Sequence, residues 1–359
     1  MEVEKLPPNT ERFLSPMTLT DQPVVPAATA APKERHPVVP LVGLTVGLGA
    51  ILVALLALFI LPSLRSGPHD LPLGLVGDPA VVAGTEDTLA ATAPDAWAPR
   101  HLASEADLRA AVEQREVVGG LVLSENGVHA VVASAGSTAI SGTVTATASS
   151  LAAASGLPVT VADVVPLPAS DPTGVGIGGL AFPLVFGGIV PAVAFATAFP
   201  RRNRWRLTGI LSFSVVGGSV VAAVLQFWFG SVTGAFLPVA AAMSFGIAAL
   251  ALPLAGLQKL FGGKGFTIGA MTMMFLGNPL AGIATTGAWL PQGLGAFGQL
   301  LPPGATGALV RSAAYFGGAG ALTPALTLAV WVAAGAVLTS LGIRRERRTA
   351  AREAQVAAA

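Results

Sequence analysis

Side chains that could carry out chemistry are few in this chain, and their spacing matches no familiar catalytic or metal site. The four histidines lie at positions 36, 69, 101 and 129, and none has a second histidine or a carboxylate at metal-ligand spacing. Zinc ligands usually occur in pairs a few residues apart, so the sequence predicts no metal site. The chain contains no cysteine, which excludes disulfide bonds and thiolate chemistry.

A glycine-rich stretch at positions 261–265, FGGKG, is a candidate for a phosphate-binding loop. It lacks the leading glycine and the trailing serine or threonine that hold a phosphate and its metal ion. No strand is predicted before it, so we expect a turn between two helices. The sequence therefore predicts no cofactor and no enzymatic activity, and it leaves any ATP hydrolysis to another chain.

Two basic clusters, RRNRWR at 201–206 and RRERR at 344–348, could contact nucleic acid or act as targeting signals. A nucleic-acid-binding surface makes its domain strongly basic, whereas this chain has a net charge of +1. Each cluster lies at the end of a long apolar segment. We therefore interpret both clusters as anchors that orient membrane helices, and we expect no nucleic-acid partner.

Apolar segments dominate the composition. Hydrophobic residues make up 53% of the 359 residues, charged residues only 11%, and the mean hydropathy is +0.70. Crossing a bilayer core about 30 Å thick takes roughly 20 apolar helical residues. The sequence thus predicts an α-helical polytopic membrane protein with six transmembrane helices. The six spans carry no Asp, Glu, His, Lys or Arg and cover 41–61, 175–199, 207–229, 236–257, 266–290 and 321–343.

Lysine and arginine residues are distributed very unequally between the two predicted sides of the membrane. One side has 13 of them, at 33, 35, 201, 202, 204, 206, 259, 264, 344, 345, 347, 348 and 352. The short loops on the opposite side have Arg311 alone. Because basic residues accumulate in cytoplasmic loops, we expect both termini in the cytoplasm and the segment 62–174 outside.

The segment 62–174 has the pattern of a small extracytoplasmic α/β domain. Strands are predicted at 71–76, 117–123, 128–133 and 159–165, and helices at 85–92, 104–115 and 138–155. The sequence SENG at 124–127 predicts a hairpin with Asn126 and Gly127 at the turn, and Ser104 with Asp107 predicts a capping box. Residues 1–40 contain eight prolines and no hydrophobic periodicity, which predicts a disordered cytoplasmic tail.

Three short motifs accompany this order of segments. They are LPLGLVGD at 71–78, DLRAAV at 107–112 followed by VGGLVL at 118–123, and the PLP, DP and G of 166–174. With them, residues 41–343 resemble ABC-2 type membrane proteins, and within these the branch related to phage-infection protein. The segment 62–174 is much shorter than in the larger phage-infection-like proteins.

The resemblance implies a permease subunit, in the bacterial cell membrane, of a transporter that exports lipid-like or amphipathic compounds. It further implies a separate ABC ATPase subunit and a homo- or heterodimer of membrane subunits in the lipid bilayer. Residues 175–343 would form a five-helix membrane domain with an outer re-entrant loop at about 291–320, followed by a basic cytoplasmic tail at 344–359. The candidate ATPase-docking loop is Arg201, Arg202, Arg204 and Arg206, and the candidate outer gate is Asn278, Pro279, Pro291, Pro302, Pro303 and Arg311.

A protein of another class is the alternative. A membrane-anchored envelope or receptor protein would bind a partner through the segment 62–174 without any transport. An ATPase that co-purifies with the chain would separate the two functions. A secondary carrier would need ionisable groups within its spans to couple an ion or a proton, and the six predicted spans have none. The sequence does not identify the substrate.

Overall fold

The computed structural model describes residues 38–291 and 293–358. The chain divides into two compact units, Met1–Ala50 and Ile51–Ala359. The division falls within the first helix, α1 (Val38–Leu64). Most of the tail that we predicted as disordered lies outside the described residues. Helix α1 contains the first predicted span, and most of its apolar side chains are exposed. Exposed apolar side chains along a whole helix suit a surface that faces lipid.

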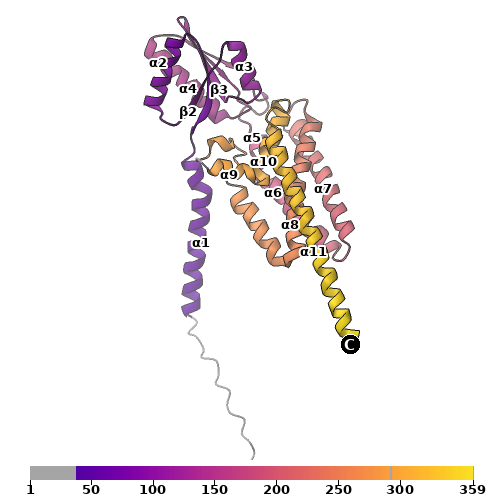
Figure 1. Cartoon of the computed structure of the whole chain (residues 1–359). Coiled ribbons are helices and arrows are strands. Elements are labelled where there is room, and N and C mark those ends of the chain that lie inside the picture. Colours follow the sequence, from indigo (N-terminus) through magenta and orange to yellow (C-terminus); the bar gives the residue numbers. More distant parts are fainter. Residues whose placement is uncertain (1–37, 292, 359) are drawn as a thin grey trace, which may run out of the picture. The chain divides into compact units, whose positions relative to one another are not determined.

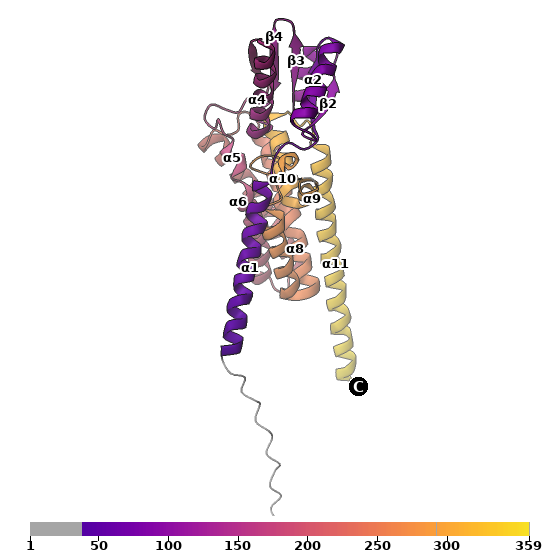
Figure 2. The ribbon, with the colours of Figure 1, turned by 90° about the vertical axis from the view of Figure 1, so that its left-hand side faces the viewer.

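The segment after α1 forms a small α/β domain, as predicted. Its sheet has the order β2-β1-β3-β4-β5, in which β3 and β4 are antiparallel and the other neighbours are parallel. Helices α2 and α4 cover one face and α3 covers the other (Figure 1). Figure 2 turns the α2 and α4 side towards the viewer. The elements are β1 (Leu71–Val76), α2 (Pro79–Thr92), β2 (Trp97–His101), α3 (Glu105–Glu113), β3 (Gly119–Ser124), β4 (Gly127–Val132), α4 (Thr138–Ser155) and β5 (Val159–Asp163).

Alternating leucines explain the core of this domain. Leu71, Leu73 and Leu75 of β1 are buried among the side chains of α2 and α4. Successive side chains of a strand point to opposite faces, so this alternation turns one side of β1 towards those two helices. On the other face of the sheet, Leu108 of α3 is also fully buried. The domain therefore has an apolar layer on each side of its sheet.

Most strand and helix predictions in this domain are confirmed, with one omission. Strand β2, with the sequence Trp-Ala-Pro-Arg-His, was not predicted, because it contains a proline and is only partly buried. It lies at an edge of the sheet, where proline is tolerated. The predicted hairpin forms, although Gly127 pairs with Ser124 as the first residue of β4. The predicted cap of α3 also forms: Ser104 Oγ accepts a 3.1 Å hydrogen bond from the Asp107 amide.

Residues from Val175 onwards form a helical domain. Helix α8 contacts α6, α7, α10 and α11 and lies at the centre of their packing (Figure 1). Two π-helical turns, η1 and η2, extend α7 and α8. The elements are α5 (Val175–Gly178), α6 (Ala181–Ala198), α7 (Asn203–Ala223), η1 (Val224–Trp228), α8 (Phe236–Thr272), η2 (Met273–Gly277), η3 (Gly287–Trp289), α9 (Leu294–Leu300), α10 (Pro302–Tyr315) and α11 (Leu322–Ala358).

Five helices among the described residues are long and apolar enough to cross a membrane. The predicted span 236–257 and the first part of the predicted span 266–290, up to Gly277, fall within a single one of these, Phe236–Gly277. This helix is interrupted at Gly262, whose φ of 71° and ψ of −157° are not helical. Beyond the interruption, Gly269 lies against Leu254 and Leu257, so the chain turns back there.

The predicted span 266–290 is too long at its end. Helical structure stops at Gly277, and residues 278–286 contain no regular helix. Asn278 still has helical angles (φ −73°, ψ −53°), and the next residue, Pro279, has no N–H to donate to a helical hydrogen bond. At the C-terminal end, the basic segment at 344–358 continues α11 as helix.

Candidate functional site

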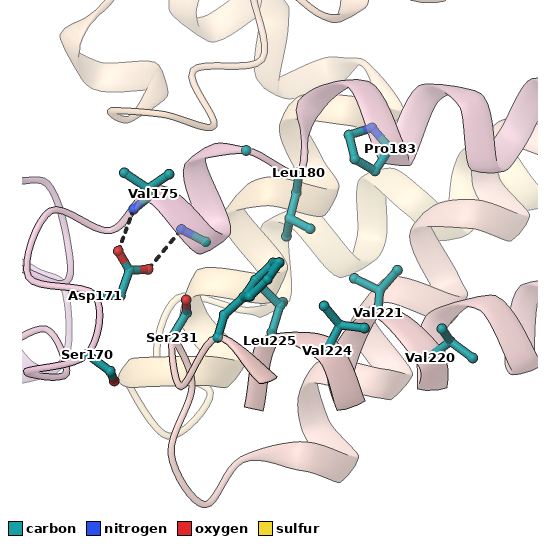
Figure 3. A pocket seen from close by; sticks show the side chains of 13 residues that line it. Ser170, Asp171, Val175, Leu180, Pro183, Val220, Val221, Val224, Leu225 and Ser231 are labelled. Carbon is teal, nitrogen blue, oxygen red and sulfur yellow. Dashed lines mark hydrogen bonds between the residues drawn. The ribbon is translucent and has the colours of Figure 1, made fainter. Parts of the chain in front are cut away.

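A cavity of about 570 Å³ lies where α5 and α6 meet the end of α7. Its volume falls within the range of roughly 300–1,000 Å³ that is usual for small-molecule sites. Figure 3 shows Ser170, Asp171 and Ser231 at one end of the cavity, with Val220 and Val221 at the other. The remaining lining residues are Val175, Gly176, Gly179, Leu180, Pro183, Val224, Leu225 and Phe229. The cavity is thus apolar along most of its wall and polar at one end.

Asp171 carries the charge at the polar end. Its Oδ1 accepts a 2.8 Å hydrogen bond from the amide of Val175, and its Oδ2 accepts one of 2.8 Å from the amide of Gly176 (Figure 3). Burial raises the pKa of this carboxyl, but the hydrogen bonds from the Gly176 amide and the Ser231 hydroxyl outweigh burial and hold the pKa below its usual value. The side chain is therefore an ionised carboxylate at neutral pH.

The local sequence fixes this carboxylate in place. The amide of Asp171 donates to Pro168 O, and the amide of Gly174 donates back to Asp171 O, which closes a tight turn before α5. A Cβ on Gly176 would meet the Ser231 hydroxyl and would lie 2.9 Å from Asp171 Oδ2. Glycine is thus required at position 176, because any side chain there would displace the carboxylate or the serine.

Ser231, on the other side of the carboxylate, is held by α10. Its side chain is only 1% exposed, and its carbonyl accepts a 2.7 Å hydrogen bond from the Tyr315 hydroxyl. Tyr315 is the last residue of α10. The polar end of the cavity is therefore built by three segments that are far apart in sequence, namely the turn before α5, the loop after η1 and the end of α10.

The apolar wall comes mainly from α7 and its π-helical extension. Val220 and Val221 precede η1, and Val224 and Leu225 belong to it. A π-helical turn inserts an extra residue into a helix and often occurs at functional sites. Val220 is 55% exposed and Phe229 is 52% exposed, although both line the cavity. The cavity is therefore open at the side of the helical domain.

The predicted ATPase-docking residues lie elsewhere, and they do not behave alike. Arg201, Arg202 and Arg204 are exposed, whereas Arg206 is buried. Arg206 Nη2 donates hydrogen bonds to the carbonyl of Ala255 (3.1 Å) and to Gln258 Oε1 (2.6 Å), both on α8. Arg206 thus joins α7 to α8, and three of the four arginines are free to meet a partner.

The predicted outer-gate residues gather around the irregular segment between η2 and α10. Pro302 and Pro303 occupy the first turn of α10, where a missing N–H costs nothing. Arg311 is 7% exposed and donates to the carbonyls of Ile283 (2.8 Å) and Thr285 (2.6 Å). The other members, Asn278, Pro279 and Pro291, lie within the irregular segment itself.

Two further side chains serve the same segment and were not predicted. Gln299 Nε2 donates to the carbonyl of Ala281 (2.9 Å), and Trp331 Nε1 donates to the carbonyl of Leu300 (2.8 Å). Backbone that leaves a helix inside an apolar environment must find such partners. The predicted gate region is thus a segment whose carbonyl groups are held by Arg311, Gln299 and Trp331.

Of the described residues that line the cavity, none belongs to the predicted sites. Asp171 entered the sequence analysis only as part of a motif. It is nevertheless the last acidic residue before Glu346, and a proline follows it directly. An isolated acid at the start of a long stretch without acidic residues is a signal that could have identified it.

Comparisons with protein-family models, with curated proteins and with solved structures give no match for this chain.

Proposed function

We propose that this chain is the permease subunit of an ABC-2 type transporter, which exports lipid-like or amphipathic compounds with energy from a separate ATPase subunit. The observation that carries the proposal is the cavity beside α6 and α7. It is apolar along most of its wall, has an ionised carboxylate at one end and opens at the side of the helical domain. A compound with an apolar body and a polar head matches such a lining.

The proposal includes six membrane spans, because the two arms on either side of Gly262 would each cross or enter the bilayer. The second arm, 263–277, is about 22 Å long at 1.5 Å per residue, which is shorter than a bilayer core of about 30 Å. The irregular segment and helices α9 and α10 would then form the re-entrant region. The hydrogen bonds from Arg311 and Gln299 support this assignment, since irregular backbone at membrane depth needs protein partners.

The proposal also includes an orientation. Both termini would be cytoplasmic, the α/β domain would lie outside, and the protein would reside in the bacterial cell membrane. The support is the distribution of basic residues near the spans, with 13 on the proposed cytoplasmic side and Arg311 alone in the short loops of the other side. The ATPase would then dock at the cytoplasmic loop that contains Arg201, Arg202 and Arg204, and two membrane subunits, identical or different, would form the transporter.

Purification of the full chain in a mild detergent tests this function. We expect an ATPase subunit to co-purify, and we expect ATP hydrolysis only when it is present. Replacing both Arg201 and Arg204 by alanine should weaken the association by about 1–3 kcal/mol, as expected for lost hydrogen bonds from charged groups. The matched control replaces Arg347 and Arg352, which are exposed on α11, and should leave the association unchanged.

Two results would count against the proposal in different ways. If the Arg201 and Arg204 variant binds the ATPase as tightly as the wild type, the cluster serves only to orient the helices. If no ATPase associates under any mild extraction, the chain is better explained as a membrane-anchored receptor or envelope protein.

A further inference from the structure

We propose that the cavity selects amphipathic compounds with a cationic headgroup, which lies against Asp171 while the apolar chain extends along Val220, Val221 and Val224. This inference names the substrate class of the proposed exporter and rests on that proposed function. The binding itself can be measured without any ATPase.

The charge of the cavity lining favours a cationic headgroup. Asp171 is the acidic residue among the described residues that line the cavity, and these include no Lys, Arg or His. Asp171 also takes part in none of the ion pairs found among the described residues. The cavity therefore has one negative charge at its polar end and no cationic side chain in its wall to balance it.

The hydrogen bonds that hold the Asp171 carboxylate leave its negative charge in place. The amides of Val175 and Gly176 direct their N–H groups at the carboxylate, and these dipoles stabilise the charge without removing it. A cation attracts a carboxylate more strongly beside apolar surface than in water, because the effective dielectric constant is lower there. A cationic headgroup at this end is therefore stabilised by its attraction to the carboxylate, whereas an anionic headgroup is destabilised by repulsion.

The direction of the cavity suits an apolar chain attached to such a headgroup. Figure 3 places Asp171, Ser170 and Ser231 together, with the valines of α7 leading away from them. A single alkyl chain has the shape and polarity to follow this apolar wall, and about 570 Å³ is enough room for one. Exposed Val220 and Phe229 mark the side from which such a chain could enter from the bilayer.

A simpler role for Asp171 is to cap the short helix α5. Replacement by asparagine removes the charge but keeps one acceptor oxygen, so it can still accept a hydrogen bond from one of the two amides, those of Val175 and Gly176. If Asp171 only caps α5, Asp171→Asn should leave the choice between headgroups unchanged.

The experiment uses the full chain in nanodiscs of zwitterionic lipid. The probe is a photoreactive analogue of dodecyltrimethylammonium, and the competitors are unlabelled dodecyltrimethylammonium and dodecyl sulfate, which share the chain length. For the wild type we expect saturable labelling within residues 170–231, with the ammonium compound competing at least tenfold better than the sulfate. In Asp171→Asn the two competitors should differ by less than twofold.

A pair of α7 variants tests the cavity itself. Val221→Trp fills the apolar wall and should abolish saturable labelling. Val216→Trp changes an exposed residue of the same helix that does not line the cavity, and it should label like the wild type. Size-exclusion elution and thermal unfolding show whether each variant folds. If Asp171→Asn does not fold, the wild-type headgroup preference and the Val221→Trp result still decide the question.

The proposal is overturned if the wild type shows no saturable labelling, if the sulfate competes as well as the ammonium compound, or if Val221→Trp labels like the wild type. A folded Asp171→Asn variant that keeps the tenfold preference overturns it as well. If labelling fails but an ATPase co-purifies, the proposed substrate class is wrong and the proposed transporter function stands. If labelling succeeds but no ATPase associates, the cavity is selective for cationic compounds and the proposed export function is wrong.

Discussion

At the scale of single residues, Asp171 should make the stability of the protein depend on pH in the acid range. Its pKa is lower in the folded chain than the ordinary value of about 3.9. Its ionisation therefore stabilises the folded state above the ordinary pKa, and this contribution is lost as pH falls through the folded pKa. We expect the difference in thermal stability between wild type and Asp171→Asn to be constant from about pH 5 to 8 and to shrink below about pH 4. A constant difference down to pH 3 would contradict this expectation.

Arg311 should stabilise the fold by donating hydrogen bonds to backbone carbonyl groups. Its guanidinium is buried and holds the carbonyls of Ile283 and Thr285. Arg311→Met keeps the apolar length of the side chain but leaves both carbonyls unpaired, which costs roughly 3 kcal/mol in total. We expect a thermal midpoint several degrees lower and faster proteolysis within 278–301. Arg204→Met, at an exposed position, is the control and should change neither. An unaltered midpoint in Arg311→Met would show that water replaces the guanidinium.

At the scale of elements, the break in α8 should require glycine at one position only. Gly262 has φ 71° and ψ −157°, a backbone region that is open almost exclusively to glycine. Its neighbour Gly263 has no such angle, and a Cβ would meet nothing within 4 Å at either residue. Gly262→Ala should therefore destabilise the protein by about 1–3 kcal/mol, and Gly263→Ala should not. Thermal unfolding of the two variants provides the measurement. Equal thermal midpoints would mean that the interruption of α8 can shift to another residue when position 262 is alanine.

Elements with a strong local pattern could be predicted from the sequence. The alternating leucines of β1 and the serine cap of α3 are local signals, and both elements formed where we expected them. Strand β2 was missed because its pairing with β1 depends on contacts across the sheet, which override a poor local pattern. The end of the predicted span 266–290 was wrong for a related reason, since an apolar run does not show where a helix stops.

The polar end of the cavity could not be predicted, because it depends on segments that meet only in the folded chain. Asp171, Ser231 and Tyr315 belong to three different parts of the sequence. Similarly, burial of Arg206 depends on acceptors on α8, so the composition of the cluster RRNRWR could not distinguish it from its exposed neighbours. Residue type indicated where charges lie, and tertiary contacts determined which of them are available to a partner.

At the scale of the whole molecule, the distribution of basic residues is the feature from which we infer the proposed orientation. The exposed arginines at 201, 202 and 204 precede most of α7, and those at 344 and 345 lie late in α11. Basic side chains near the ends of membrane helices hold those ends in the cytoplasm. The α/β domain contains 10 of the 19 acidic residues between positions 70 and 125, and acidic residues contribute little to orientation.

Reporter fusions test this orientation directly. A reporter after Ala359 or within 201–206 should give a cytoplasmic signal, and one within 80–165 should give an external signal, because 13 basic residues flank the spans on the first side and the short loops of the other side have Arg311 alone. Reversal of the four arginines at 201–206 to acidic residues should disturb the insertion of the two helices that flank them, since the flanking charge determines their direction. Replacing only Arg201 and Arg204 should leave every reporter signal unchanged, because eleven of those 13 basic residues remain on that side. A cytoplasmic signal from a fusion within 80–165 would mean that the α/β domain is cytoplasmic and the proposed orientation is reversed. The arginines at 201, 202 and 204 would then lie outside, where a cytoplasmic ATPase cannot reach them, so their proposed docking role would also be wrong.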